Sequence, residues 1–162
     1  YAASDPDLLT WVHVAEVSSF LAAHLRYRNP QLSRADQDAY YDEVALIAER
    51  LGARDVPRSC LQVEAYLQRM RSQLQCDARS LEVVEVLLAA PAPSRLAEPV
   101  GKLMLRAGID LLPDWAQAML GLQQGMLQRH IIRLGLKRTA PVLRWAMRDG
   151  SAHRARRRMG ID

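Results

Sequence analysis

The fold class of this chain is decided by one apolar stretch near its start, residues 5–27, with the sequence DPDLLTWVHVAEVSSFLAAHLRY. Asp5 followed by Pro6 is typical of a helix start, because Asp accepts hydrogen bonds from free amides and Pro suits the first turn. The pair Asn29-Pro30 predicts the helix end, since a residue before proline avoids the helical conformation. The apolar side chains of this predicted helix point nearly all round the helix axis. We therefore predict a helix buried in the middle of the domain.

The rest of the chain is predicted to be helical as well. Leu, Ala, Arg, Gln and Glu abound, aromatic residues make up 6% of the 162 residues, and no alternating strand pattern is present. Ser33 with Asp36, Ser59 with Gln62, and Asp77 alone have the pattern of helix N-caps. The predicted helices lie at about 33–51, 59–74, 77–90, 96–107, 112–121 and 122–134, with a last one starting at 139–141. The expectation is an all-α, multi-helix globular domain over residues 1–162.

Composition predicts a cytoplasmic protein. Cys60 and Cys76 are too few for a disulfide framework and lack C-x-x-C spacing, which favours a reducing compartment. No apolar run approaches the ~20 residues that a bilayer demands, so we expect no transmembrane segment and no signal peptide. The chain begins with Tyr1 rather than Met, and we interpret it as a fragment of a longer protein.

Positive charge gathers near the C-terminus. From Arg133 to Arg158 there are nine Lys or Arg, and Asp149 is the one acid among them. Such a segment can attract nucleic acid or an anionic membrane surface. The alternative is a solvated basic tail over residues 150–162, which we favour because no aromatic interleaving or DNA-reading motif accompanies the charge. Nucleic acid is therefore not an expected partner.

Titratable side chains form one strip on the first predicted helix. His13 and Glu16 fall with Leu9, Phe20 and His24 within an arc of about 80°. His13 and Glu16 are three residues apart, which suits a hydrogen bond between them or joint contact with a ligand. The competing interpretation is that His13 forms a hydrogen bond with a neighbouring helix. No glutamate outside this helix is followed by a histidine three residues later, so a di-metal carboxylate site is not expected. Phosphate-loop, nucleophile-elbow and zinc signatures are absent from the sequence, and no catalytic residue or metal ligand is assigned.

A family resemblance begins at the same helix. Residues 1–14, YAASDPDLLTWVHV, resemble the Trp-Val-His segment of the MpaB and rubber-oxygenase (latex-clearing protein) family. Residues 32–52, 56–70 and 111–122 resemble later blocks of that family, so the resemblance covers most of the chain. It implies an all-helical, globin-like fold that holds a b-type haem and uses O₂ to cleave carbon–carbon double bonds in isoprenoid-like or other hydrophobic substrates.

The resemblance also implies where the haem contacts lie. The axial histidine and the neighbouring Arg and Thr of the haem pocket belong to blocks upstream of Tyr1, so no residue here is given those roles. His13 matches the Trp-Val-His position, and we expect it to line the haem pocket with Trp11 and Glu16 as neighbours. The chain is then the C-terminal half of an oxygenase-like domain, and we expect it to associate with its upstream half or with a second copy of itself.

Two other functions compete with the oxygenase. One is a non-catalytic helical domain that binds a hydrophobic ligand. The other is a nucleic-acid-binding regulator with a helical ligand domain, as in TetR-like proteins, but no helix-turn-helix accompanies the basic segment. A Soret band in the visible spectrum separates the oxygenase from both alternatives.

Overall fold

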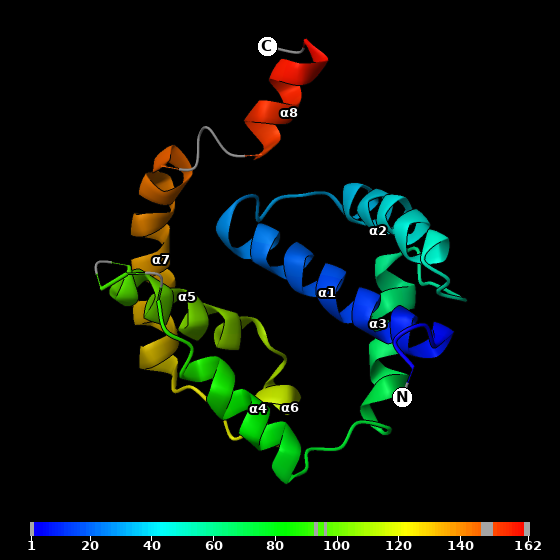
Figure 1. The fold of residues 1–162 in the computed structure, drawn as a ribbon, viewed down its shortest axis with the longest axis horizontal. Helices are drawn as coiled ribbons and strands as arrows, with labels where there is room; N and C mark the ends of the chain where they lie inside the picture. The colour runs from blue at the N-terminus through cyan, green and yellow to red at the C-terminus, as the bar shows by residue number, and fades with distance from the viewer. Residues whose placement is uncertain (1, 93, 96, 147–150, 161–162) are drawn as a thin grey trace. The chain divides into compact units, whose positions relative to one another are not determined.

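The computed structural model describes residues 2–92, 94–95, 97–146 and 151–160, and these residues contain helices and no strand (Figure 1). This confirms the all-α fold class. The described helices are α1 Pro6–Tyr27, α2 Arg34–Arg50, α3 Cys60–Arg71, α4 Ala78–Leu88, α5 Glu98–Leu111, α6 Asp114–Met119, α7 Met126–Ala146 and α8 Ser151–Met159.

The chain divides into two compact units, Tyr1–Val84 and Glu85–Asp162, which are described separately below. That residues 1–162 belong to one domain stays a prediction. Much of the expected basic tail is helical: α8 carries four exposed arginines (Arg154, Arg156, Arg157 and Arg158). Residues 150, 161 and 162 of that tail lie outside the described residues.

Unit 1 is built on α1, which packs against α2 and α3, and these two helices also contact each other. The predicted N-caps are confirmed. The Asp5 carboxylate accepts from the amides of Asp7 and Leu8, and the Ser33 hydroxyl accepts from the Asp36 amide while donating to its carboxylate. The main core cluster comprises Val14, Val17, Leu21, Tyr41, Cys60 and Val63.

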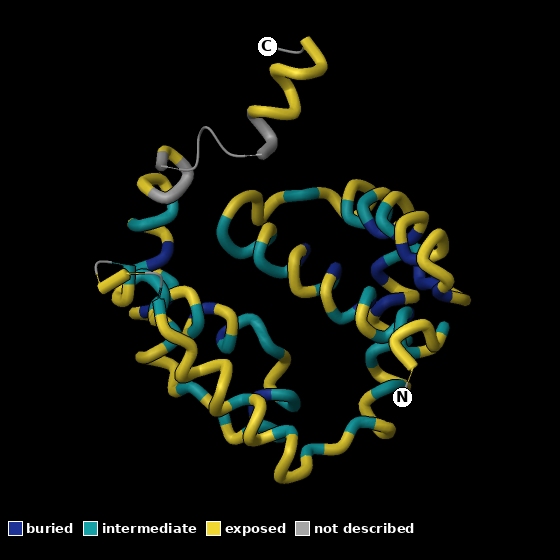
Figure 2. The backbone as a smooth tube through the Cα atoms, viewed as in Figure 1, coloured by how far each residue is buried: buried dark blue, intermediate teal, exposed yellow. Residues whose placement is uncertain are grey.

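The prediction that α1 is buried on every side is wrong. Its buried residues are Thr10, Val14, Val17 and Leu21, which recur every three or four positions and so share one face (Figure 2). Val12 and Phe20 are 52% and 60% exposed. In unit 1, α1 packs mainly against α2 and α3, and Leu9 also packs against the small cluster of Ala45, Ala48, Ala53 and Val56. The exposed apolar surface of α1 therefore lies at residues such as Val12 and Phe20.

One described helix is long and apolar enough to cross a membrane by length and composition alone, and it is α1. The expectation that no apolar run approaches that length therefore needs correction. Core helices and signal sequences pass the same test, so this single helix is weak evidence for a membrane span.

Unit 2 is organised by the pairing of α5 with α7. Ile132 and Leu136 of α7 are buried, and Gly135 lies close to the side chain of Leu103 on α5. The prediction of two separate helices here, 122–134 and one that starts at 139–141, is wrong, because α7 runs from Met126 to Ala146 through Pro141. Proline removes one amide donor, but Pro141 is exposed, so water can solvate the carbonyl that it leaves unpaired.

Candidate functional site

The candidate residues of α1 fall on two sides of its buried face. His13 is half-buried, whereas Glu16 is exposed and, as predicted, lies on the same side of the helix as His13. Trp11 is also half-buried, but the helical period places it roughly 160° from His13. His13 and Glu16 can therefore contact one ligand together, and Trp11 belongs to a different surface of the same helix.

The surroundings of His13 favour its neutral form. Desolvation by burial lowers the pKa of His13, and the nearby Glu16 charge opposes that shift without cancelling it. The pKa of the Tyr40 phenol, whose hydroxyl donates to the Val17 carbonyl at 3.3 Å, is raised by burial and secondarily by Glu16. A neutral imidazole can donate or accept a hydrogen bond and can bind iron, so His13 has the chemistry expected of a residue at a cofactor.

A buried hydroxyl that the sequence pattern did not single out anchors the start of α1. Thr10 is 3% exposed, and its Oγ1 lies 2.9 Å from the Pro6 carbonyl oxygen and 2.8 Å from that of Arg54. The same oxygen accepts from the Arg54 amide at 3.2 Å. Thr10 thus ties the loop after α2 to the helix that carries His13. The sequence did not reveal the contact between Thr10 and Arg54, because the two residues are 44 positions apart and a single threonine in an apolar helix has no distinctive pattern.

Cys60 is a structural residue. It is 4% exposed, its amide donates to the Asp38 carboxylate at 2.7 Å, and burial raises the pKa of its thiol to about 11. At neutral pH the group is therefore a thiol rather than the nucleophilic thiolate.

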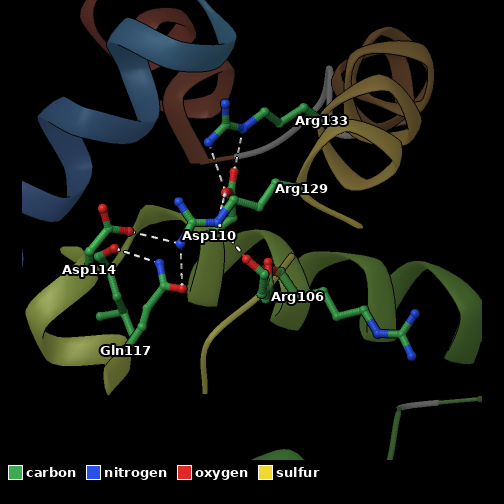
Figure 3. Close-up of polar contacts among 8 residues, drawn as sticks. Arg106, Asp110, Asp114, Gln117, Arg129 and Arg133 are labelled. Atoms are coloured by element: carbon green, nitrogen blue, oxygen red, sulfur yellow. Dashed lines mark hydrogen bonds and ion pairs between the residues drawn. The ribbon is translucent and has the colours of Figure 1, made fainter. Parts of the chain in front are cut away.

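Unit 2 contains a polar cluster that joins α5, α6 and α7 (Figure 3). The Asp110 side chain is fully buried and accepts two hydrogen bonds from Arg133, Nε at 2.8 Å and an Nη at 2.9 Å. Arg129 lies 3.8 Å from the same carboxylate and donates to Asp114 at 2.8 Å and to Gln117 Oε1 at 2.9 Å. Gln117, 0% exposed, donates in turn to the Leu112 carbonyl at 2.8 Å.

This cluster holds three helices together rather than presenting a reactive group. Both Asp110 oxygens accept hydrogen bonds from Arg133, and the Gln117 amide is satisfied as donor and acceptor. Sequence reasoning missed the cluster. A usable signal was the four-residue spacing of Arg129 and Arg133, which puts both guanidinium groups on one face of α7.

Two cavities are described, one in each unit. In unit 1 about 410 Å³ is lined by residues that include Asp55, Arg58 and Arg69. In unit 2 about 710 Å³ is lined mainly by apolar residues between the end of α4 and α5, from Leu88 to Leu105. Histidine, cysteine, methionine and tyrosine are absent from both linings. Across the described part of the chain, no group of three or more His, Cys, Asp or Glu is placed to hold a metal ion.

Comparison with known proteins gives one match. Residues 1–145 match the family model described as ER-bound oxygenase mpaB/B'/Rubber oxygenase, catalytic domain. The chain belongs to this family. No curated protein and no solved structure matches it. The match covers α1 to α6 and nearly all of α7, and it supports an oxygenase-type function.

The family resemblance implies a haem, and the residues that line the two cavities show whether either could hold one. A haem pocket needs an axial ligand that faces an apolar cavity. Neither described cavity has such a ligand, and His13 lines neither of them. Taken singly, the cavities of the two units do not fit a haem.

Proposed function

We propose that this chain forms part of a b-type-haem-dependent oxygenase that uses O₂ on an isoprenoid-like or other hydrophobic substrate. The family match supports an oxygenase, and the observation that carries the finer proposal is the His13 face of α1. There a half-buried imidazole with a lowered pKa lies on the same side of the helix as the exposed ring of Phe20.

His13 is assigned contact with the haem, and Glu16 is assigned a position beside it. The neutral imidazole can hydrogen-bond a bound ligand or coordinate iron, whereas a protonated one can only donate. Phe20, 60% exposed on the same side of the helix, offers the apolar contact that a porphyrin or an isoprenoid needs. Haem, when bound, supplies the O₂ chemistry, and the chain supplies binding and orientation.

The test is a visible spectrum of the protein purified from haem-replete cells, together with haem titration of the 162-residue chain. The proposal expects a Soret band that His13→Ala shifts or weakens and that the matched variant His24→Ala leaves unchanged, since His24 is exposed near the end of α1. A titrated chain that shows a histidine-ligated spectrum dependent on His13 would make His13 itself the axial ligand and would correct the expectation that this ligand lies upstream. No Soret band in the haem-replete protein would refute the proposal.

One observation favours a second function, a non-catalytic domain that binds a hydrophobic ligand. The cavity of about 710 Å³ in unit 2 lies within the size range of small-molecule sites and has a largely apolar lining. This alternative predicts no haem absorbance but saturable binding of a fatty acid or an isoprenoid alcohol. Gly101→Leu should fill part of the cavity and weaken that binding, since Gly101 lines it.

A further inference from the structure

The outward face of α7 is apolar. Leu127, Ile131, Leu134, Val142 and Trp145 make up this face, here named the α7 stripe, and they are 75%, 61%, 44%, 63% and 73% exposed. With Arg138 between Leu134 and Val142, their spacing is three or four residues throughout, so they follow one side of the helix. The opposite side carries the buried Ile132 and Leu136, which belong to the core of unit 2. At 1.5 Å per residue the α7 stripe is about 27 Å long.

Positive charge accompanies the α7 stripe. Arg138 lies within it, and Lys137 is exposed beside it. The following helix, α8, adds four exposed arginines. From Arg133 to Arg158 the sequence has nine cations and one acid. An apolar strip with basic neighbours and a tryptophan near one end is the pattern of helices that lie in the interface of an anionic bilayer.

We propose that the α7 stripe and its basic neighbours form a docking surface for an anionic lipid bilayer. The five apolar side chains enter the boundary between headgroups and acyl chains, and Lys137, Arg138 and the α8 arginines contact the acidic headgroups. A nucleic acid would use the cations but gain nothing from an apolar strip of this length. A second copy would bring two basic surfaces together, which like-charge repulsion opposes. The proposal is independent of haem binding.

The direct test is co-sedimentation of the chain with vesicles. Binding should be strong to phosphatidylcholine vesicles with about 30% phosphatidylserine, weak to pure phosphatidylcholine, and reduced by salt. The double variant Lys137→Gln/Arg138→Gln should weaken the partition coefficient by about 25-fold, or about fivefold per charge. Arg28→Gln/Arg50→Gln is the matched control, because both residues are exposed in unit 1 and the charge change is the same.

The apolar contribution needs its own variants. Leu127→Asn/Ile131→Asn should lower the partition coefficient at least about tenfold, since each change withdraws a buried aliphatic side chain from the membrane. Met126→Asn/Leu61→Asn is the control, because both side chains are highly exposed but lie outside the α7 stripe. Vesicles should also shift tryptophan emission to the blue, and Trp145→Phe should remove that shift while Trp11→Phe does not.

Four results would overturn the proposal. The first is equal binding to neutral and anionic vesicles. The second is an equal loss of binding in the stripe variants and their controls when far-UV circular dichroism shows intact helices. The third is a concentration-dependent dimer, seen without lipid, that Leu127→Asn/Ile131→Asn abolishes. The fourth is tight binding of duplex DNA or RNA that needs Lys137 and Arg138 but is unaffected by Leu127→Asn/Ile131→Asn.

Discussion

Removing the charge of Asp110 should destabilise unit 2 more than any comparable surface change. The Asp110 side chain is fully buried, and Arg133 donates to both of its oxygens. Asp110→Asn keeps the shape but removes the carboxylate that Arg133 contacts and turns an amide N–H toward an N–H of that guanidinium. Breaking a fully buried pair costs roughly 3–5 kcal/mol. Arg133 and Arg129 are 41% and 25% exposed, so water recovers part of this cost, and we expect about 2–3 kcal/mol.

The assay is thermal and urea unfolding followed by far-UV circular dichroism, with Asp114→Asn as the matched control. Asp114 bonds Arg129 at 2.8 Å, but its side chain is 83% exposed, and such pairs contribute about 1 kcal/mol or less. We expect Tm to fall by about 5–10 °C for Asp110→Asn and by less than about 3 °C for Asp114→Asn. The double variant Asp110→Asn/Arg133→Gln should recover part of the loss, because it also removes the cation that would face the new amide. Equal losses for Asp110→Asn and Asp114→Asn would refute the reasoning.

Three further predictions concern unit 1. Thr10→Val should cost about 1–3 kcal/mol in the free energy of unfolding, since it leaves the Arg54 amide and carbonyl without the hydroxyl that both now contact, and Thr10→Ser should restore most of it. Cys60 should react with a disulfide reagent at pH 8 far more slowly than an ordinary thiol, because a pKa of about 11 leaves roughly one thiolate in a thousand. Single Cys60→Ser and Cys76→Ser variants assign the fast and slow phases of this reaction, and a fast phase that disappears in Cys60→Ser would contradict the prediction. The pKa of His13 in the folded chain lies below its unfolded value of 6.5, so between these two pKa values the unfolded chain binds more protons. Stability should therefore rise with pH up to about 6.5 and fall on acidification below it. A His13→Gln variant with the same pH dependence would exclude His13 as the cause.

The helix starts of unit 1 were predictable because their signals are local. A cap is decided within four residues, and Asp5, Ser33, Ser59 and Asp77 all bond the amides expected of them. The predicted helix break before Pro141 is wrong because the cost of a proline depends on solvent exposure, which the local sequence does not show. The sequence shows that Pro141 removes one amide donor. It does not show that Pro141 and Lys137, whose carbonyl loses that donor, are both exposed, so that water can replace the bond at small cost.

The burial of α1 was not predictable from its apolar pattern. A helical wheel shows which sides can be buried and says nothing of how many neighbours are present to cover them. The polar cluster around Asp110 was missed because it joins residues 23 positions apart, Asp110 and Arg133, through the packing of α5 on α7. Long-range pairs of this kind depend on helix packing and leave no short-range pattern beyond the four-residue spacing of Arg129 and Arg133 on α7.

The one-sided packing of α1 narrows the choice among its candidate site residues. A ligand cannot reach the face that carries Val14 and Val17, which is filled by unit 1 itself. It can reach the side shared by His13, Glu16 and Phe20, where a group with a lowered pKa adjoins exposed apolar surface. Trp11 lies across the buried face from that side, so one planar ligand cannot touch Trp11 and His13 together. If the site proposal is right, substitutions at His13 and Phe20 should act on the same ligand, and a substitution at Trp11 should not.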